Sequence, residues 1–189
     1  TAQDRFLKFI QLQKSGDATV LADAYNRIGD CYMHVRRFDE AKQYYTRAEN
    51  LGTPASDYSY YQLALVSGLQ KNYDGKITLL NRLANKYPNS PYAVNALYEK
   101  GRSYVQSRNN NQAIATFREL LNKYPESPVS RKAATEIGLL YYQNDDYSHA
   151  IEAYKHVISK YPGSEEARLA MRDLKSIYVE ANRVDEFAA

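Results

Sequence analysis

Small and bulky apolar residues recur at helical spacing along this chain, in blocks that short polar segments separate. In one such block Tyr104 follows Gly101 by three residues, and Phe117 follows Ala113 by four. Residues three or four positions apart share one face of an α-helix, and a small residue on that face lets a second helix approach closely. The pattern therefore predicts pairs of packed antiparallel helices, and we expect the fold to be all-α.

The same columns return at a nearly constant interval of 35, 37 and 37 residues. They are Gly29, Ala64, Gly101 and Gly138; Tyr32, Ser67, Tyr104 and Tyr141; Ala41, Lys76, Ala113 and Ala150; and Tyr45, Leu80, Phe117 and Tyr154. A period of this length is typical of a protein built from repeated helix hairpins. The second copy is degenerate, because Ala64, Ser67 and Lys76 depart from the pattern.

A short motif marks the boundary between repeats. Residues 123–128 read Lys-Tyr-Pro-Glu-Ser-Pro, and related segments stand 37 residues to either side, at 86–91 and 160–164. Lysine favours the negative end of a helix, and the proline two positions later cannot continue that helix. Serine then supplies an N-cap oxygen, and the proline after it fits the first turn of the next helix. Each copy is expected to end one helix and begin another.

These signals predict the helix boundaries. First helices of the hairpins are expected near residues 20–34, 56–70, 91–106, 128–143 and 164–181, and second helices near 38–51, 73–86, 110–123 and 147–160. Residues 1–19 are interpreted as the second helix of a truncated preceding repeat, and residues 20–181 as four hairpins plus the first helix of a fifth. Residues 182–189 are interpreted as the start of a truncated helix. Because neither end has a polar capping element, we expect a fragment of a longer repeat protein.

The columns resemble the tetratricopeptide repeat (TPR) over about residues 20–181. The third and fourth copies carry the resemblance most fully, with Gly101, Tyr104, Ala113, Phe117, Leu120 and Pro125, and with Gly138, Tyr141, Ala150, Tyr154, Val157 and Pro162. The resemblance implies a right-handed superhelical solenoid whose first helices line a concave groove. It also implies a non-catalytic scaffold that binds a peptide or partner protein in that groove and uses no cofactor.

The 37-residue period is longer than the usual 34 residues of the family. The extra length falls at the Tyr-Pro-x-Ser-Pro junction. This variant resembles the repeats of bacterial envelope proteins, of the type of the periplasmic Tol–Pal-associated protein and the TPR lipoprotein of the outer-membrane β-barrel assembly machine. The resemblance favours a periplasmic or outer-membrane-associated location over the cytoplasm.

The groove is expected on the side of each first helix that faces away from its partner helix. The candidate partner-binding residues there are Asn26, Tyr58, Tyr61, Asn95, Tyr98, Arg102 and Tyr142, on faces that also carry Asp23, Asp30, Met33, Leu65, Val105, Lys132, Thr135 and Leu139. Tyrosine and arginine are enriched at binding surfaces. The alternative is that the tyrosines, 19 in all, fill the space between helices. Tyr32, Tyr104 and Tyr141 are expected to pack in this way, with hydroxyl partners at the edge.

The sequence contains few residues arranged in a pattern typical of a catalytic or metal site. His149 and His156 lie seven residues apart on one predicted helix, but two surface histidines without a nearby carboxylate or cysteine make a poor metal site. Cys31, the single cysteine, is expected to be a buried small hydrophobe. No phosphate-binding glycine loop, zinc spacing or nucleophile elbow occurs. We therefore expect no enzyme activity and no bound metal.

Composition and charge argue against nucleic-acid binding and membrane insertion. Hydrophobic residues make up 44% and charged residues 25%, a globular composition, and the net charge is only +3. This charge gives no indication of nucleic-acid binding, and Asp23 and Asp30 make the expected groove locally acidic, against an RNA-reading helical repeat. No apolar run reaches the length of a membrane span, so no direct membrane insertion is expected. A structural spacer without a groove ligand and homo-oligomerisation through uncapped repeat ends both remain open.

Overall fold

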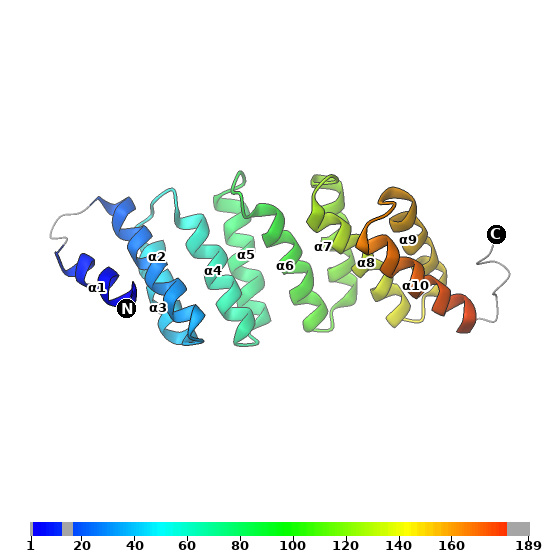
Figure 1. Cartoon of the computed structure of the whole chain (residues 1–189), viewed down its shortest axis with the longest axis horizontal. Coiled ribbons are helices and arrows are strands. Elements are labelled where there is room, and N and C mark those ends of the chain that lie inside the picture. The colour runs from blue at the N-terminus through cyan, green and yellow to red at the C-terminus, as the bar shows by residue number, and fades with distance from the viewer. Residues whose placement is uncertain (1, 13–16, 181–189) are drawn as a thin grey trace. The chain divides into compact units, whose positions relative to one another are not determined.

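The computed structural model describes residues 2–12 and 17–180, and this part of the chain forms ten helices and no strand (Figure 1). The helices are α1 Ala2–Leu12, α2 Ala18–His34, α3 Phe38–Asn50, α4 Ser56–Leu69, α5 Tyr73–Lys86, α6 Ala93–Gln106, α7 Asn110–Lys123, α8 Pro128–Gln143, α9 Tyr147–Lys160 and α10 Glu165–Glu180. The prediction of an all-α helical repeat is confirmed, and the boundaries predicted for the nine hairpin helices agree with these bounds to within two residues. The helix start predicted at residues 182–189 lies outside the described residues.

The chain divides into two compact units, residues 1–96 and 97–189, and each is described by itself. The right-handed superhelical path expected for the whole array stays a prediction. Within the units, first helices pack against the second helix of their own hairpin, as α2 does with α3, α4 with α5 and α8 with α9. Second helices also contact the next first helix, as α3 does with α4 and α9 with α10. Helix α1 packs against α2 in the same manner.

The turn inside each hairpin has one backbone conformation in all four copies. The residues Arg36, Lys71, Arg108 and Asp145 all have φ near +60°. In the last copy the Asp146 N–H donates to the Tyr141 carbonyl (2.9 Å) and the Asp145 N–H donates to the Tyr142 carbonyl (3.0 Å), which is the hydrogen-bond pattern of a Schellman helix end. The next residue caps the following helix, because the Asp146 carboxylate accepts from the His149 N–H. The polar turn residues thus end one helix and start the next.

The boundary motif ends one helix and begins the next, as its residues predict. Lys123 is the last residue of α7, and Tyr124 follows at the C-cap, where its N–H donates to the Leu120 carbonyl (2.9 Å). The Ser127 side chain caps α8 by accepting from the Val129 N–H (3.2 Å), and Pro128 stands in the first turn. At the later copy the Ser164 hydroxyl accepts from the Ala167 N–H (3.0 Å) and begins α10 in the same way.

The glycine column allows each hairpin to close on an aromatic ring. A Cβ atom on Gly29 would lie 2.5 Å from the Tyr45 ring, and one on Gly138 would lie 2.7 Å from the Tyr154 ring. The aromatic side chains at these crossings, Tyr45, Phe117 and Tyr154, are fully buried. In the degenerate second copy Ala64 and Leu80 belong to one core cluster. The leucine side chain is smaller than the aromatic rings of the other copies, and this leaves room for the methyl group of Ala64. The size of the small residue and the size of its partner therefore vary together.

Candidate functional site

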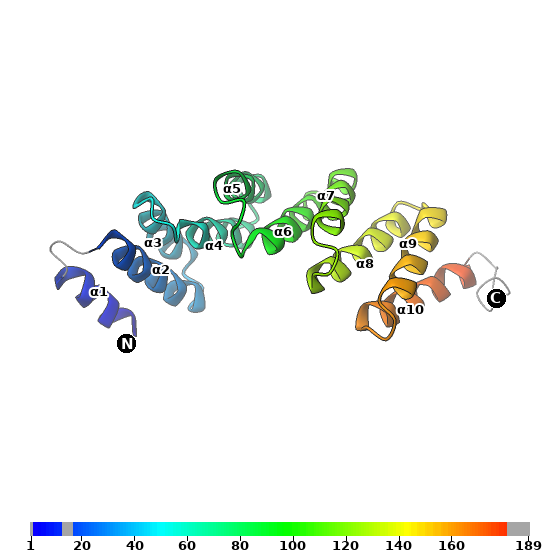
Figure 2. The same cartoon turned by 90° about the horizontal axis from the view of Figure 1, so that it is seen from above.

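First and second helices form two layers within each unit. In the view from above, α2 and α4 lie on one side of their unit and α3 and α5 on the other (Figure 2). The residues expected to bind a partner all belong to the first-helix layer, on α2, α4, α6 and α8. The two units place them in different surroundings.

In unit 1, one tyrosine from a first helix and one from a second helix donate to the same carboxylate. The hydroxyls of Tyr58 and Tyr45 both donate to Asp30 Oδ1, at 2.6 and 2.8 Å, and Arg27 Nη1 donates to Asp30 Oδ2 at 3.1 Å. Burial, and next the carboxylate of Asp30, raise the pKa of both Tyr45 and Tyr58 above the usual tyrosine range. Tyr58 therefore ties α2, α3 and α4 together through Asp30.

The other candidates of unit 1 divide between buried and partly exposed positions. Asn26 is only 2% exposed, and its Oδ1 accepts from the buried Ser59 hydroxyl at 2.9 Å, so it bonds α2 to α4 instead of facing solvent. Tyr61 is half-buried and stacks on Tyr92, with ring centroids 5.2 Å apart and an interplanar angle of 16°. Asn95, in the first turn of α6, is exposed.

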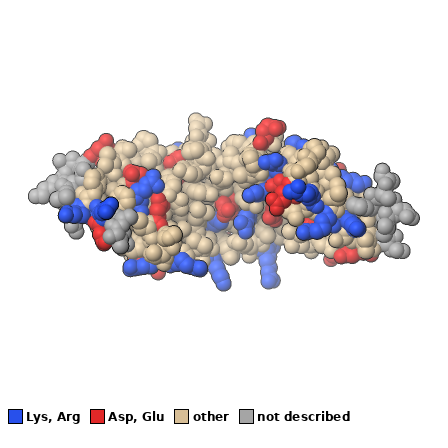
Figure 3. All heavy atoms as spheres, viewed as in Figure 1, with Lys and Arg blue, Asp and Glu red and all other residues tan. Residues whose placement is uncertain are grey.

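In unit 2, residues of the first helices line an open cavity of about 440 Å³. Its lining residues are Tyr98 from α6; Lys132, Thr135, Glu136 and Leu139 from α8; and Glu165, Glu166, Leu169, Arg172 and Asp173 from α10. The α8 residues are spaced three and four positions apart, which places them on one face of that helix. Half-buried Leu139 and Leu169 form apolar patches between charged side chains. Figure 3 shows acidic and basic groups next to one another over this part of the surface.

The candidate residues of unit 2 differ in how they relate to this cavity. Tyr98 lines it, and its ring packs at 5.7 Å from the Phe117 ring. Arg102 follows one turn later on α6 and is exposed. Tyr142 is not among the lining residues, because its hydroxyl lies 2.9 Å from each carboxylate oxygen of Glu180 and its ring packs near Tyr147. The structure thus brings Tyr98 together with Lys132, Thr135 and Leu139, and places Tyr142 elsewhere.

Glu136 is the carboxylate least compensated by its neighbours in the cavity. Burial raises the pKa of its carboxyl, and Arg102 acts in the opposite direction. No hydrogen bond or ion pair reaches this carboxylate from any residue of the described chain. Asp173 differs, because Arg172 Nη2 pairs with it at 2.9 Å and the Tyr154 hydroxyl lies within 3.5 Å. A half-buried carboxylate without a partner is energetically costly unless a ligand supplies one.

The sequence expectation did not include Glu136 or the α10 side of the cavity. The groove positions predicted from the sequence cover only the four complete hairpins. Shifting Lys132, Thr135 and Glu136 by the 37-residue period leads to Leu169, Arg172 and Asp173, all of which line the cavity. The period could therefore have identified the α10 residues, but it does not single out Glu136.

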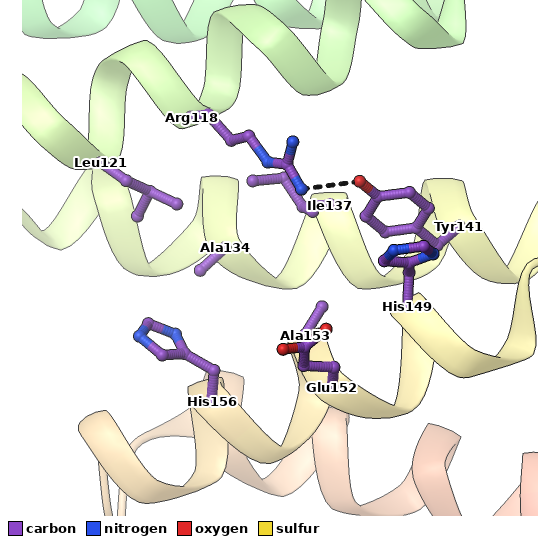
Figure 4. Close-up of a pocket in the computed structure, with 9 residues that line it drawn as sticks. All are labelled: Arg118, Leu121, Ala134, Ile137, Tyr141, His149, Glu152, Ala153 and His156. Atoms are coloured by element: carbon purple, nitrogen blue, oxygen red, sulfur yellow. Dashed lines mark hydrogen bonds between the residues drawn. The ribbon is translucent and has the colours of Figure 1, made fainter.

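A second, smaller hollow of about 260 Å³ lies between α7, α8 and α9 (Figure 4). Leu121, Ala134, Ile137 and Ala153 form its apolar part, and Arg118, Tyr141, His149, Glu152 and His156 its polar part. Arg118 Nη2 donates to the Tyr141 hydroxyl at 2.8 Å, as drawn by the dashed line, and His149 stacks on the Tyr141 ring at 5.0 Å. Tyr141 is therefore a packing residue with a hydroxyl partner at the edge, as predicted.

No metal site is formed by the described part of the chain, in which no group of three or more His, Cys, Asp or Glu residues could hold an ion. A carboxylate does lie beside His149, contrary to expectation: Asp146, the cap residue of α9, is 2.8 Å from the imidazole Nδ1. Cys31 is only partly buried, and not fully buried as expected. None of the helices described here is long and apolar enough to cross a membrane.

Three family models match successive parts of the chain. Two tetratricopeptide-repeat models match residues 22–52 and 58–90, and the model of the outer membrane lipoprotein YfiO matches residues 93–183. No curated protein matches the chain significantly. The repeat columns, the helix hairpins and the family models agree that this chain contains tetratricopeptide repeats.

Solved structures with the same fold cover most of the chain. MamA from Desulfovibrio magneticus RS-1 has a TM-score of 0.70 and 18% identity, with 92% of this chain and 90% of that chain covered. A tetratricopeptide-repeat protein from Parabacteroides merdae has a TM-score of 0.71 and 15% identity, over 88% and 63%. YrrB, described as a TPR protein with an unusual peptide-binding site, has a TM-score of 0.65 and 15% identity, over 94% and 84%. At these identities the likeness concerns the fold alone.

Proposed function

We propose that the chain is a non-catalytic protein-interaction scaffold that holds a segment of a partner protein against the first-helix layer of unit 2. The observation that carries this proposal is the cavity between α6, α8 and α10. It combines apolar surface from Leu139 and Leu169 with a rim of charged groups, the composition of a site that anchors a side chain and orients the segment around it. YrrB provides a precedent for peptide binding by this fold.

The proposal keeps some of the partner-binding residues predicted from the sequence and gives others an internal role. Tyr98 and Arg102 lie at or beside the cavity, and Tyr61 with Asn95 offers surface on unit 1. Asn26 acts inside the unit as a packing residue, and Tyr58 bonds Asp30. The partner is a protein or peptide and no cofactor takes part. The similarity of residues 93–183 to an outer membrane lipoprotein supports a place at the bacterial cell envelope.

Peptide selection with the full chain tests the proposal. Random peptides displayed on phage are selected against the protein, and the affinity of the best binder is measured by fluorescence polarisation. Thr135→Arg inserts a long side chain into the cavity from α8 and is expected to weaken binding more than about tenfold, because it occupies the space of the anchor side chain. Ala115→Arg adds the same charge at an exposed position of α7 and is the matched control.

The outcomes separate the proposed site from its alternatives. Equal weakening by both variants, or by neither, would show that the cavity is not the binding site. Amide NMR shifts confined to α7 and α9 would move the site to the hollow of Figure 4. Failure to select any binding peptide would favour a structural spacer. Circular dichroism and thermal melting confirm that each variant is folded.

A further inference from the structure

The unpartnered state of Glu136 follows from a difference between two repeats. In the fourth hairpin the Tyr154 hydroxyl lies 3.5 Å from the Asp173 carboxylate of the next first helix. The residues 37 positions earlier are Phe117 and Glu136. Phenylalanine has no hydroxyl, so the donor that serves Asp173 has no counterpart for Glu136. The third hairpin therefore leaves a half-buried carboxylate facing the cavity without an internal donor.

The charges around the cavity leave this carboxylate uncompensated. The lining contains four carboxylates, Glu136, Glu165, Glu166 and Asp173, and two cations, Lys132 and Arg172. Arg172 is already paired with Asp173. Arg102 on α6 acts on Glu136 only at a distance, since no ion pair between them is formed. The cavity is thus acidic on balance, in a chain whose net charge is +3.

The shape of the cavity suits a long side chain with an apolar stem. Its volume of about 440 Å³ is within the roughly 300–1,000 Å³ of small-ligand pockets. Leu139 and Leu169 can cover methylene groups, and the Tyr98 ring stands beside them. Lysine and arginine place apolar stems along such surfaces and carry their charge at the tip.

We propose that the cavity between α6, α8 and α10 binds a lysine or arginine side chain of the partner segment, with the Glu136 carboxylate as the acceptor for its charged head group. This inference rests on the proposed function, because it names the anchor residue of the same site. A cation at Glu136 supplies the charge-assisted hydrogen bond that Phe117 cannot supply. Glu165 and Glu166 line the same cavity and disfavour a segment that carries a carboxylate at this place.

Two synthetic peptides that differ by one charge test the inference. Both are acetylated and amidated glycine-serine hexapeptides; one carries a central arginine, and the other carries citrulline, its uncharged analogue of the same shape. Each is titrated at millimolar concentration into the isotope-labelled full chain, with amide shifts of α6, α8 and α10 as the readout. The arginine peptide is expected to bind at least about tenfold more tightly than the citrulline peptide.

Two matched variants test which carboxylate causes the preference for the arginine peptide. Glu136→Gln keeps the shape of the side chain and is expected to abolish the preference for arginine. Glu152→Gln removes the same charge from an exposed position of α9 and is expected to leave the preference intact. Loss of the preference in both variants, or in neither, would overturn the role of Glu136, since the attraction would then be a property of the net charge or of another carboxylate.

The result also distinguishes this inference from the proposed function. If the peptides selected on phage bind at the cavity, but arginine and citrulline peptides bind equally or not at all, the scaffold function stands and the cation site is wrong. If no peptide of either kind perturbs α6, α8 or α10, both proposals fail. Thermal melting of Glu136→Gln confirms that a loss of binding does not reflect unfolding.

Discussion

At the residue scale, the surroundings of Glu136 oppose its charge, because the side chain is half-buried and no described residue bonds to its carboxylate. Burial raises the pKa of its carboxyl above the usual 4.5, and Arg102 only partly offsets the effect. A carboxyl whose pKa is raised by folding binds its proton more tightly in the folded state than in the unfolded state. Its ionisation therefore opposes folding, and this cost develops as the pH rises through the raised pKa.

This linkage predicts a pH-dependent effect of Glu136→Gln on stability. At pH 7 the wild-type carboxylate is charged and unpartnered, so the variant should melt at a higher temperature than the wild type. At pH 4, below the usual glutamate pKa, the carboxyl is mostly protonated in both the folded and the unfolded state, and the advantage of the variant should become small. Melting curves at several pH values between 4 and 7 measure this difference.

The control for this experiment is Glu152→Gln, which makes the same change in net charge at an exposed position. The difference between the two variants isolates the contribution of burial at residue 136. A melting temperature that is lower for Glu136→Gln than for the wild type at pH 7 would mean that Glu136 is stabilised by its surroundings.

At the element scale, the hairpins close through matched pairs of small and large residues. Gly138 packs against Tyr154, Gly101 against Phe117 and Gly29 against Tyr45. In the second copy Ala64 shares a core cluster with Leu80. The distance between the two helix axes is set by the two side chains together, because protein cores are closely packed. A glycine next to an aromatic ring and an alanine near a leucine can therefore fill the same distance between two helix axes.

This interpretation predicts coupling between Gly138→Ala and Tyr154→Leu. The alanine methyl alone would press against the Tyr154 ring at 2.7 Å and should cost about 1–3 kcal/mol. The leucine alone leaves space beside Gly138 and should also destabilise. Together they reproduce the pair Ala64 and Leu80, so the double variant should lose at least about 1 kcal/mol less than the sum of the single variants. Urea unfolding of all four proteins measures the coupling.

A distant pair is the control for this cycle. Gly138→Ala combined with Tyr45→Leu changes residues in different units, and their effects should add to within about 0.5 kcal/mol. Additive behaviour of the neighbouring pair as well would show that the residues at the crossing do not constrain one another.

At the scale of the whole molecule, charge and repeat architecture together favour a protein partner over a nucleic acid. The net charge is +3, and the cavity of unit 2 is acidic on balance. Binding to nucleic acid requires cations aligned along a surface, since each phosphate contact releases counterions. The first-helix layer instead alternates carboxylates, cations and tyrosines. Such a mixed surface is suited to a segment of mixed composition.

Random single-stranded RNA is therefore expected not to bind the full chain. Fluorescence polarisation with labelled RNA should show no change at low salt, where electrostatic attraction is strongest, and none at physiological salt. Binding that weakens steeply as salt increases would contradict this expectation and would favour an RNA-binding helical repeat.

Much of the fold could be predicted from local features of the sequence. Small and aromatic residues at fixed intervals predict the hairpins, and the Lys-Tyr-Pro-x-Ser motif predicts where helices end and begin, as at Lys123 and Ser127. These features act over one or two helical turns, through caps, helix dipoles and contacts between residues three or four positions apart. Spacing along the chain is sufficient information for interactions of this range.

The site depended on information that spacing does not contain. Helical phase alone placed both Asn26 and Tyr98 on the same type of face, yet Asn26 bonds Ser59 inside the protein and Tyr98 lines a cavity. The unpartnered state of Glu136 depends on residues of α6, α8 and α10 meeting at one cavity, and on the lack of a hydroxyl group on Phe117. The sequence by itself determined the repeat, the helices and their ends. Tertiary structure decided which polar groups found partners, because burial and pairing depend on three helices that are distant in sequence and adjacent in space.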